Sequence, residues 1–243
     1  MEPRRIIAAL DATDIGRVRD LARAVEPHVW GCKIGLEFFV QHGPSGIEKA
    51  GLDPQRLFLD LKFHDIPNTV AGAIRAASAI RPAMFNVHAG GGPAMLAAAR
   101  AARDEMAAKT GHKPLLLAVT VMTSLDDADL ASVGQSGPVL SQVRRLAALA
   151  QNNGLDGVVC SSREIAMLRR DCGAGFKLVV PGIRPLGAAT HDQKRIMSPA
   201  DAIAAGADYL VIGRPINAAP DPAAAARAIA DSLAKSLREP ARP

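Results

Sequence analysis

The chain alternates between short apolar runs rich in β-forming residues and longer segments whose apolar residues recur with helical spacing. Val18, Leu21, Ala22 and Val25, for example, fall on one face of a helix. The apolar runs that we interpret as strands are Ile6–Leu10, Val29–Ile34, Leu57–Leu61, Met84–His88, Leu115–Val121, Gly157–Cys160, Leu178–Val180 and Leu210–Ile212. The pattern therefore predicts eight strands separated by helices.

These strands are apolar on both faces, which is typical of parallel strands buried beneath helices. Strands that alternate with helices imply right-handed crossovers. Divided among eight units, the 243 residues leave about 30 residues per unit, the size of one strand–helix repeat. We therefore predict an α/β fold, a (β/α)8 TIM barrel formed as a single domain by residues 1–243. The alternative, an open doubly wound sheet, lacks a GxGxxG sequence after the first strand.

Local signals mark several helix ends. Ser161 with Glu164 three residues later forms a capping box, and Ser198 followed by Pro199 starts another helix. The segment after the seventh strand, residues 182–198, carries Gly182, Pro185 and Gly187 and is the longest loop that the pattern predicts. A long loop at this place in a barrel is expected to be a mobile lid rather than a linker between domains.

Composition and charge exclude several classes of function. The apolar runs are far shorter than the roughly 18 residues of a membrane span. The net charge of +5 is spread along the chain, and one Trp and one Tyr offer little to stack on bases, so we expect no nucleic-acid partner. Three cysteines without a CxxC pair, together with a start unlike a secretory signal, favour the cytoplasm. Six dispersed histidines give no zinc signature.

Charged residues interrupt the third strand where an apolar pattern is expected. Because side chains alternate along a strand, Asp60 and Lys62 lie on the face opposite Leu59 and Leu61 and point into the barrel. Burying charges there is costly unless they are paired. A structural ion pair would explain these two residues alone. Asp65, just beyond the strand, lies at the height where barrel enzymes hold catalytic groups.

Other strands also end in polar residues, and in a barrel all these ends lie on one rim. Stability alone does not explain why five strands share this feature. The polar residues at the other four strand ends are Asp11, Lys33, Asn86 with His88, and Thr120 with Thr123 and Ser124.

The loops after the seventh and eighth strands both carry Gly and Arg. Pro181 and Arg184 follow the seventh strand, and Gly213 and Arg214 follow the eighth. Barrels often bind phosphate with these two loops, because a glycine lets the backbone approach an anion and an arginine donates to two of its oxygens. We therefore expect a phosphate-bearing ligand.

Together these residues resemble the orotidine 5′-phosphate decarboxylase family. The stretch from Asp60 to Val70 is close to the family signature. The resemblance continues, in the family's order, through the motifs at Asp11, Lys33, Asn86 to His88, Thr120 to Ser124, Pro181 to Arg184, and Gly213 to Arg214. Departures are small: Met122 replaces a common Leu, and Gly90 a common Ser.

The resemblance implies a homodimeric barrel enzyme that removes the carboxylate of orotidine 5′-phosphate without cofactor or metal. Lys62 matches the residue that protonates C6 of the pyrimidine, and Asp60 the carboxylate beside the departing group. Asp65 and Thr69 match residues that reach into the partner subunit's site. The substrate-binding matches are Asp11 and Lys33 for the ribose and charge network, Thr123 and Ser124 for the pyrimidine, and Arg184, Gln193, Gly213 and Arg214 for the phosphate, with Pro181 beside them.

Two other functions remain open from the residues alone. A metal-dependent sugar-phosphate decarboxylase or aldolase would use the Asp60, Lys62 and Asp65 core to hold Mg²⁺. A nucleotide-phosphate binding module without catalysis would use Arg214 but leave the burial of Asp60 and Lys62 unexplained.

Overall fold

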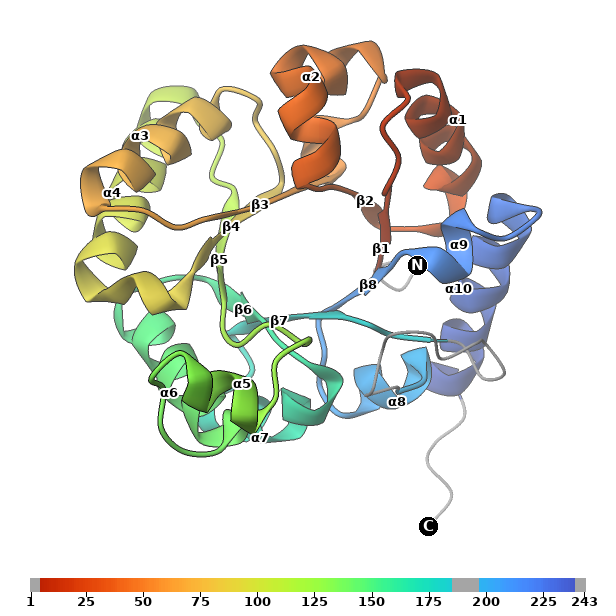
Figure 1. Cartoon of the computed structure of the whole chain (residues 1–243). Coiled ribbons are helices and arrows are strands. Elements are labelled where there is room, and N and C mark those ends of the chain that lie inside the picture. Colours follow the sequence, from red (N-terminus) through yellow and green to blue (C-terminus); the bar gives the residue numbers. More distant parts are fainter. Residues whose placement is uncertain (1–4, 185–196, 239–243) are drawn as a thin grey trace.

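The computed structural model describes residues 5–184 and 197–238, and its strands close into a parallel barrel in sequence order. Each strand pairs with the next, and the last pairs with the first. Helices surround the barrel on the outside (Figure 1). This architecture confirms the predicted (β/α)8 fold. The strands are β1 (Ile6–Ala9), β2 (Gly31–Ile34), β3 (Leu57–Phe63), β4 (Met84–His88), β5 (Leu115–Val119), β6 (Gly157–Val159), β7 (Lys177–Pro181) and β8 (Tyr209–Ile212).

The helices follow the strands as the apolar spacing predicts. In α1 the buried residues are Val18, Leu21 and Val25. The α-helices are α1 (Ile15–Val25), α2 (Leu36–Lys49), α3 (Pro67–Ser78), α4 (Gly92–Thr110), α5 (Asp127–Ser132), α6 (Val139–Asn152), α7 (Ile165–Cys172), α8 (Pro199–Ala204), α9 (Arg214–Asn217) and α10 (Pro222–Arg238). Short 3₁₀ turns are η1 (Glu26–His28), η2 (Pro54–Arg56), η3 (Ala89–Gly91) and η4 (Ser162–Glu164).

The predicted helix signals are confirmed with one shift. Ser161 and Glu164 form the expected capping box, but on the 3₁₀ turn η4 that leads into α7. Ser198 caps α8 by accepting a hydrogen bond from the Asp201 N–H. The mobile loop expected at about 182–198 falls mostly on residues 185–196, which lie outside the described residues.

The apolar core has two layers. A large cluster lies between the strands and the helices, and a small one fills the barrel interior. The interior cluster consists of Ile7, Ala9, Phe58, Met84, Leu117, Val179 and Val211. The next inward positions after Phe58 and Met84 are the buried polar residues Asp60 and Asn86. The barrel is therefore apolar through its middle and becomes polar towards the carboxyl ends of β3 and β4.

The pairing of β3 with β4 departs from simple alternation. Leu59 lies opposite Phe85, but Phe63 lies opposite Val87, so four steps along β3 match two along β4. Lys62 lies inside this bulge with a φ of +49°. A bulge of this kind re-aims a side chain. Asp60 does point inwards as predicted, whereas the direction of Lys62 is set by the bulge and not by alternation.

No helix among residues 5–184 and 197–238 is both long enough and apolar enough to cross a membrane.

Candidate active site

One carboxylate links two lysines at the carboxyl end of the barrel. Lys62 Nζ lies 2.7 Å from Asp60 Oδ1, and Lys33 Nζ lies 3.3 Å from Asp60 Oδ2. Lys33 Nζ also lies 3.5 Å from Asp11 Oδ1. The four side chains come from three neighbouring strands, since Asp11 follows β1, Lys33 belongs to β2 and the other two belong to β3. The structure thus brings together four of the residues that the sequence analysis selected.

The network keeps Asp60 ionised although only 8% of the residue is exposed. Burial pushes the pKa of the Asp60 carboxyl upwards. The positive charges of Lys33 and Lys62 outweigh this effect, assisted by hydrogen bonds from Lys62 and Asn86. The pKa of Asp60 therefore lies below its ordinary value, and the site holds one ionised carboxylate between two lysine side chains.

Asn86 is part of this network, although the sequence analysis assigned it no role. Its Nδ2 donates to Asp60 Oδ1 at 2.7 Å, and its Oδ1 accepts the backbone N–H of Lys62 at 2.8 Å. A usable signal was present in the sequence. Asn86 follows the inward-facing Met84 by two positions, as Asp60 follows Phe58.

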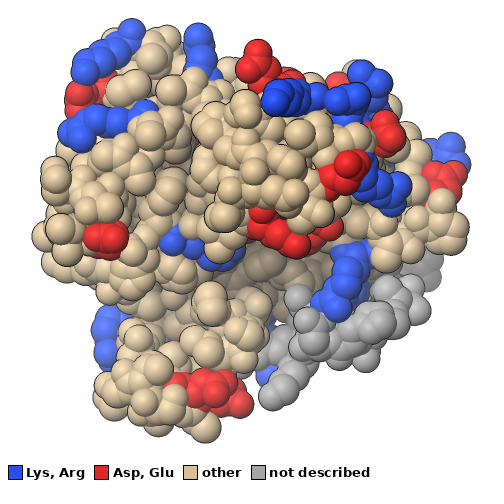
Figure 2. All heavy atoms as spheres, turned by 45° about the horizontal axis from the view of Figure 1, so that its top comes forward, with Lys and Arg blue, Asp and Glu red and all other residues tan. Residues whose placement is uncertain are grey.

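Two cavities open onto the charged network and share Lys33, Asp60 and Lys62 in their walls. The larger, of about 240 Å³, also contains Thr123, Ser124 and Pro181. The smaller, of about 190 Å³, is lined by Asp11 and the start of α2. Figure 2 shows a hollowed face of the molecule with both acidic and basic side chains at its edge. The candidate pyrimidine and ribose residues therefore line the space beside the lysines.

The residues expected to bind phosphate lie in the loops that follow the adjacent strands β7 and β8. Arg184 is buried, with 5% of the residue exposed, whereas Arg214 is exposed at the start of α9. Gly213 is closely packed: a Cβ there would lie 3.2 Å from Asp11 Oδ2. A side chain at this position would thus press against the charged network. Gln193 lies outside the described residues.

Asp65 and Thr69 are exposed where β3 leads into α3. The Asp65 carboxylate accepts a hydrogen bond from the N–H of Ile66 at 2.6 Å. Ile66 itself is 66% exposed. Neither Asp65 nor Thr69 belongs to the walls of the two cavities in this chain.

Two histidines lie next to the network. The rings of His64 and His88 have centroids 5.4 Å apart. Burial lowers the pKa of His88, and the charges of His64 and Lys62 lower it further, against the opposing effect of Asp60. His88 is therefore a neutral ring at physiological pH. Within residues 5–184 and 197–238, no three His, Cys, Asp or Glu side chains gather as potential metal ligands.

Comparison with known proteins agrees with this geometry. Residues 4–229 match the model of the orotidine 5'-phosphate decarboxylase / HUMPS family. A Rhodospirillum rubrum protein named orotidine 5'-phosphate decarboxylase is 55% identical over 232 residues, covering 94% of this chain and 93% of the relative. A Moorella thermoacetica protein of the same name is 53% identical over 231 residues, covering 94% and 92%. A crystal structure of orotidine 5'-phosphate decarboxylase from Lactobacillus acidophilus has a TM-score of 0.82 and 36% identity, covering 95% of this chain and 99% of that one.

Proposed function

Because the chain belongs to the orotidine 5'-phosphate decarboxylase / HUMPS family, we propose that it converts orotidine 5′-phosphate to uridine 5′-phosphate. This reaction is the last step of de novo UMP synthesis. The observation that carries the proposal is the buried Asp60 carboxylate held between Lys33 and Lys62 at a cavity. A buried carboxyl with a shifted pKa and charged partners at a cavity is typical of a functional site.

The chemical step is assigned to Lys62. When the bond between C6 and the carboxylate breaks, its electron pair stays on C6 and CO₂ leaves. The Lys62 ammonium stabilises the negative charge that develops at C6 and then donates a proton to form the C6–H bond. Lysine recovers its proton from water. This role is supported by the position of the ammonium, which is held 2.7 Å from Asp60 in the wall of the larger cavity.

Asp60 has two roles in this mechanism. It holds Lys62 and Lys33 in place as ammonium ions, and its low pKa keeps it charged while it does so. It also places a negative charge beside the substrate carboxylate, which disfavours the bound substrate relative to a transition state that is losing CO₂. The mechanism requires no cofactor and no metal, because the lysine supplies both the positive charge and the proton.

The rest of the substrate extends from the network along the rim. We assign the pyrimidine to Thr123 and Ser124, and the ribose hydroxyls to Asp11 and Lys33, since these residues line the two adjoining cavities. The phosphate is assigned to the β7 and β8 loops, which follow neighbouring strands on the same rim. The residues proposed there are Arg184, Gln193, Gly213 and Arg214, with Pro181 between the phosphate and the pyrimidine.

The active unit is proposed to be a homodimer in which Asp65 and Thr69 complete the partner's site. Both residues are exposed and stand apart from the cavities of their own chain. Apolar residues exposed nearby on the same rim support a protein interface there. Leu36 and Val40 of α2 are 53% and 81% exposed, and Ile66 lies beside Asp65. We further propose that the whole chain forms one barrel domain that works in the cytoplasm.

The test is direct. Purified protein is mixed with orotidine 5′-phosphate, and the loss of the substrate's ultraviolet absorbance is followed with and without EDTA. We expect turnover that EDTA does not change. Turnover that EDTA abolishes would support the metal-dependent alternative, and binding without turnover would support the binding module; either result contradicts the proposed reaction.

A further inference from the structure

Asn86 connects the two members of the Asp60–Lys62 pair through one carboxamide. Its Nδ2 donates to the Asp60 oxygen that also accepts from Lys62 Nζ, and its Oδ1 accepts the Lys62 backbone N–H. The three residues therefore form a closed ring of hydrogen bonds. Asn86 is fully buried, with 0% of the residue exposed, and it does not line either cavity.

The backbone of Lys62 needs this support. Its φ of +49° is a left-handed conformation, in which a residue with a Cβ is strained. The bulge in β3 produces this conformation and interrupts the regular pairing with β4 opposite Asn86. The carboxamide of Asn86 accepts the Lys62 N–H within this interruption. A side chain of β4 thus supplies a hydrogen bond where the strand ladder is irregular.

We propose that Asn86 is a positioning residue for the decarboxylation. By holding the Lys62 backbone and the Asp60 carboxylate together, it determines where the Lys62 ammonium lies in the cavity. The proposal rests on the role assigned to Lys62 above. A residue that acts in this way changes the rate of the chemical step, whereas a residue that only stabilises the barrel changes the melting temperature and leaves the chemistry of the folded enzyme intact.

The first test compares Asn86→Ala with Phe85→Leu. Phe85 is the preceding residue of β4, is equally buried, and packs in the outer cluster away from the network. We expect kcat of Asn86→Ala to fall about 10²-fold, the effect of misplacing a catalytic group by roughly 1 Å. KM should change by less than about threefold, since the contacts proposed for the pyrimidine and phosphate come from other loops. Phe85→Leu should lower the melting temperature with kcat and KM unchanged.

The result that overturns the proposal is a folded Asn86→Ala enzyme with wild-type kcat. A loss of activity matched by the unfolded fraction would overturn it equally. Wild type and Lys62→Ala are measured in parallel. If the wild type turns over substrate and Lys62→Ala does not, the proposed function stands, and a normal Asn86→Ala enzyme then counts against the positioning role alone.

Asn86→Asp gives a second readout that does not depend on the alanine variant. The new carboxyl keeps the shape and the acceptor for Lys62 N–H but loses the donor towards Asp60. The ionisable groups around it are Asp60, Lys33, Lys62 and the His64–His88 pair. Repulsion from Asp60 favours protonation of the new carboxyl, which restores a donor.

We therefore expect kcat of Asn86→Asp to rise as the pH falls, in a range where wild-type kcat does not rise. A pH profile parallel to that of the wild type would overturn the proposal, because a structural role would not couple kcat to the new carboxyl.

Discussion

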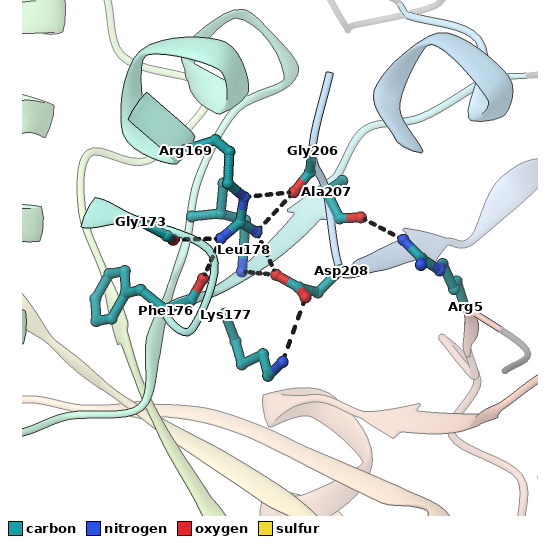
Figure 3. Close-up of polar contacts among 9 residues, drawn as sticks. All are labelled: Arg5, Arg169, Gly173, Phe176, Lys177, Leu178, Gly206, Ala207 and Asp208. Carbon is teal, nitrogen blue, oxygen red and sulfur yellow. Dashed lines mark hydrogen bonds and ion pairs between the residues drawn. The ribbon is translucent and has the colours of Figure 1, made fainter. Parts of the chain in front are cut away.

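The two ends of the barrel use charged residues in opposite ways. At the amino ends of the strands, the Arg169 guanidinium donates to the carbonyls of Gly173, Phe176 and Gly206 and to the Asp208 carboxylate (Figure 3). At the carboxyl ends, the Asp60 carboxylate joins two lysines beside a cavity. Most partners of Arg169 are backbone groups of loops, whereas Lys33 and Lys62 are held by side chains.

This arrangement of Arg169 is repeated around the amino end. Arg103, only 2% exposed, donates to the carbonyl of Pro114 and to Asp156, and Arg56 donates to the carbonyls of Val29 and Trp30. Each of these arginines ties together loops that precede strands. A guanidinium whose donors are satisfied by carbonyls is locked in place and stabilises the fold. A lysine that shares one carboxylate and faces a cavity remains available to a ligand.

The largest expected effect is at the carboxyl end. Replacing Lys62 with alanine removes the positive charge that stabilises the negative charge developing at C6, and it also removes the proton donor. We therefore expect kcat to fall by at least about 10⁴-fold. The variant should still fold, because Lys33 and Asn86 continue to hold the Asp60 carboxylate when Lys62 is removed. Steady-state kinetics and thermal unfolding of the same preparation measure both. A folded variant that retains turnover would refute the role of Lys62. The charged residues at the carboxyl end would then have no functional role to set against the structural role of the arginines at the amino end.

The next prediction tests whether the carboxyl end is completed by a partner. Asp65→Ala and Lys62→Ala proteins should each be inactive, since each dimer lacks one group in both sites. Mixed and allowed to exchange subunits, they should regain about one quarter of wild-type activity, because half of the dimers are hybrids with one intact site. Activity is measured after exchange, and the exchange itself is verified with differently tagged subunits. Verified exchange without recovery would contradict the shared site.

Arg169→Ala tests the amino end. It should lower the free energy of unfolding by about 2–4 kcal/mol, because the carbonyls of Phe176 and Gly206 lose a charged donor and Asp208 loses its ion pair with the guanidinium. Turnover per folded molecule should not change. The control is Arg170→Ala, the next residue of α7, whose side chain is 70% exposed and pairs with Asp171, so its loss should cost less than about 1 kcal/mol. Urea unfolding measures both variants. Equal losses of stability would contradict the structural role of Arg169.

The smallest effect concerns acid stability. The pKa of Asp60 is lowered in the folded state, so its ionisation stabilises the fold above its ordinary pKa of 3.8, and this contribution is lost as the pH falls through the lower folded value. As the pH falls below about 5, the free energy of unfolding of the wild type should therefore decrease more than that of Asp60→Asn. Urea unfolding at a series of pH values measures the difference. Parallel curves would show that the network does not hold Asp60 ionised.

Much of the fold was predictable because it depends on local sequence. The apolar runs marked each strand, although their ends shifted: β3 extends to Phe63, and β7 begins at Lys177. The capping residues Ser161 and Ser198 were visible because a cap requires only its own helix. The inward direction of Asp60 followed from alternation, which holds as far as the strand remains regular.

Contacts between distant residues were less predictable. The selection of Asp11, Lys33, Asp60 and Lys62 was possible because the carboxyl ends of parallel strands share one rim. The hydrogen bonds of Asn86 to Asp60 and to the Lys62 backbone were not predicted, because they depend on the register between β3 and β4. Register is a property of two strands rather than one. Asp65 was selected from its place just beyond the third strand, but Thr69 and the reach of both residues into a partner's site came only from the family resemblance. Within a single chain the two residues lie apart from the network.

The amino-acid sequence by itself determined the barrel and the rim on which the charged residues gather, because apolar periodicity and strand order are encoded along the chain. Only the tertiary structure decided how Lys62 is held. Its left-handed backbone, the bulge around it and the hydrogen bonds from Asn86 arise where two strands fail to stay in register. The physical reason is that the register of two strands depends on contacts along the whole barrel and not on either strand alone. A bulge in one strand is tolerated where neighbouring side chains form hydrogen bonds with the backbone groups that the bulge leaves unpaired.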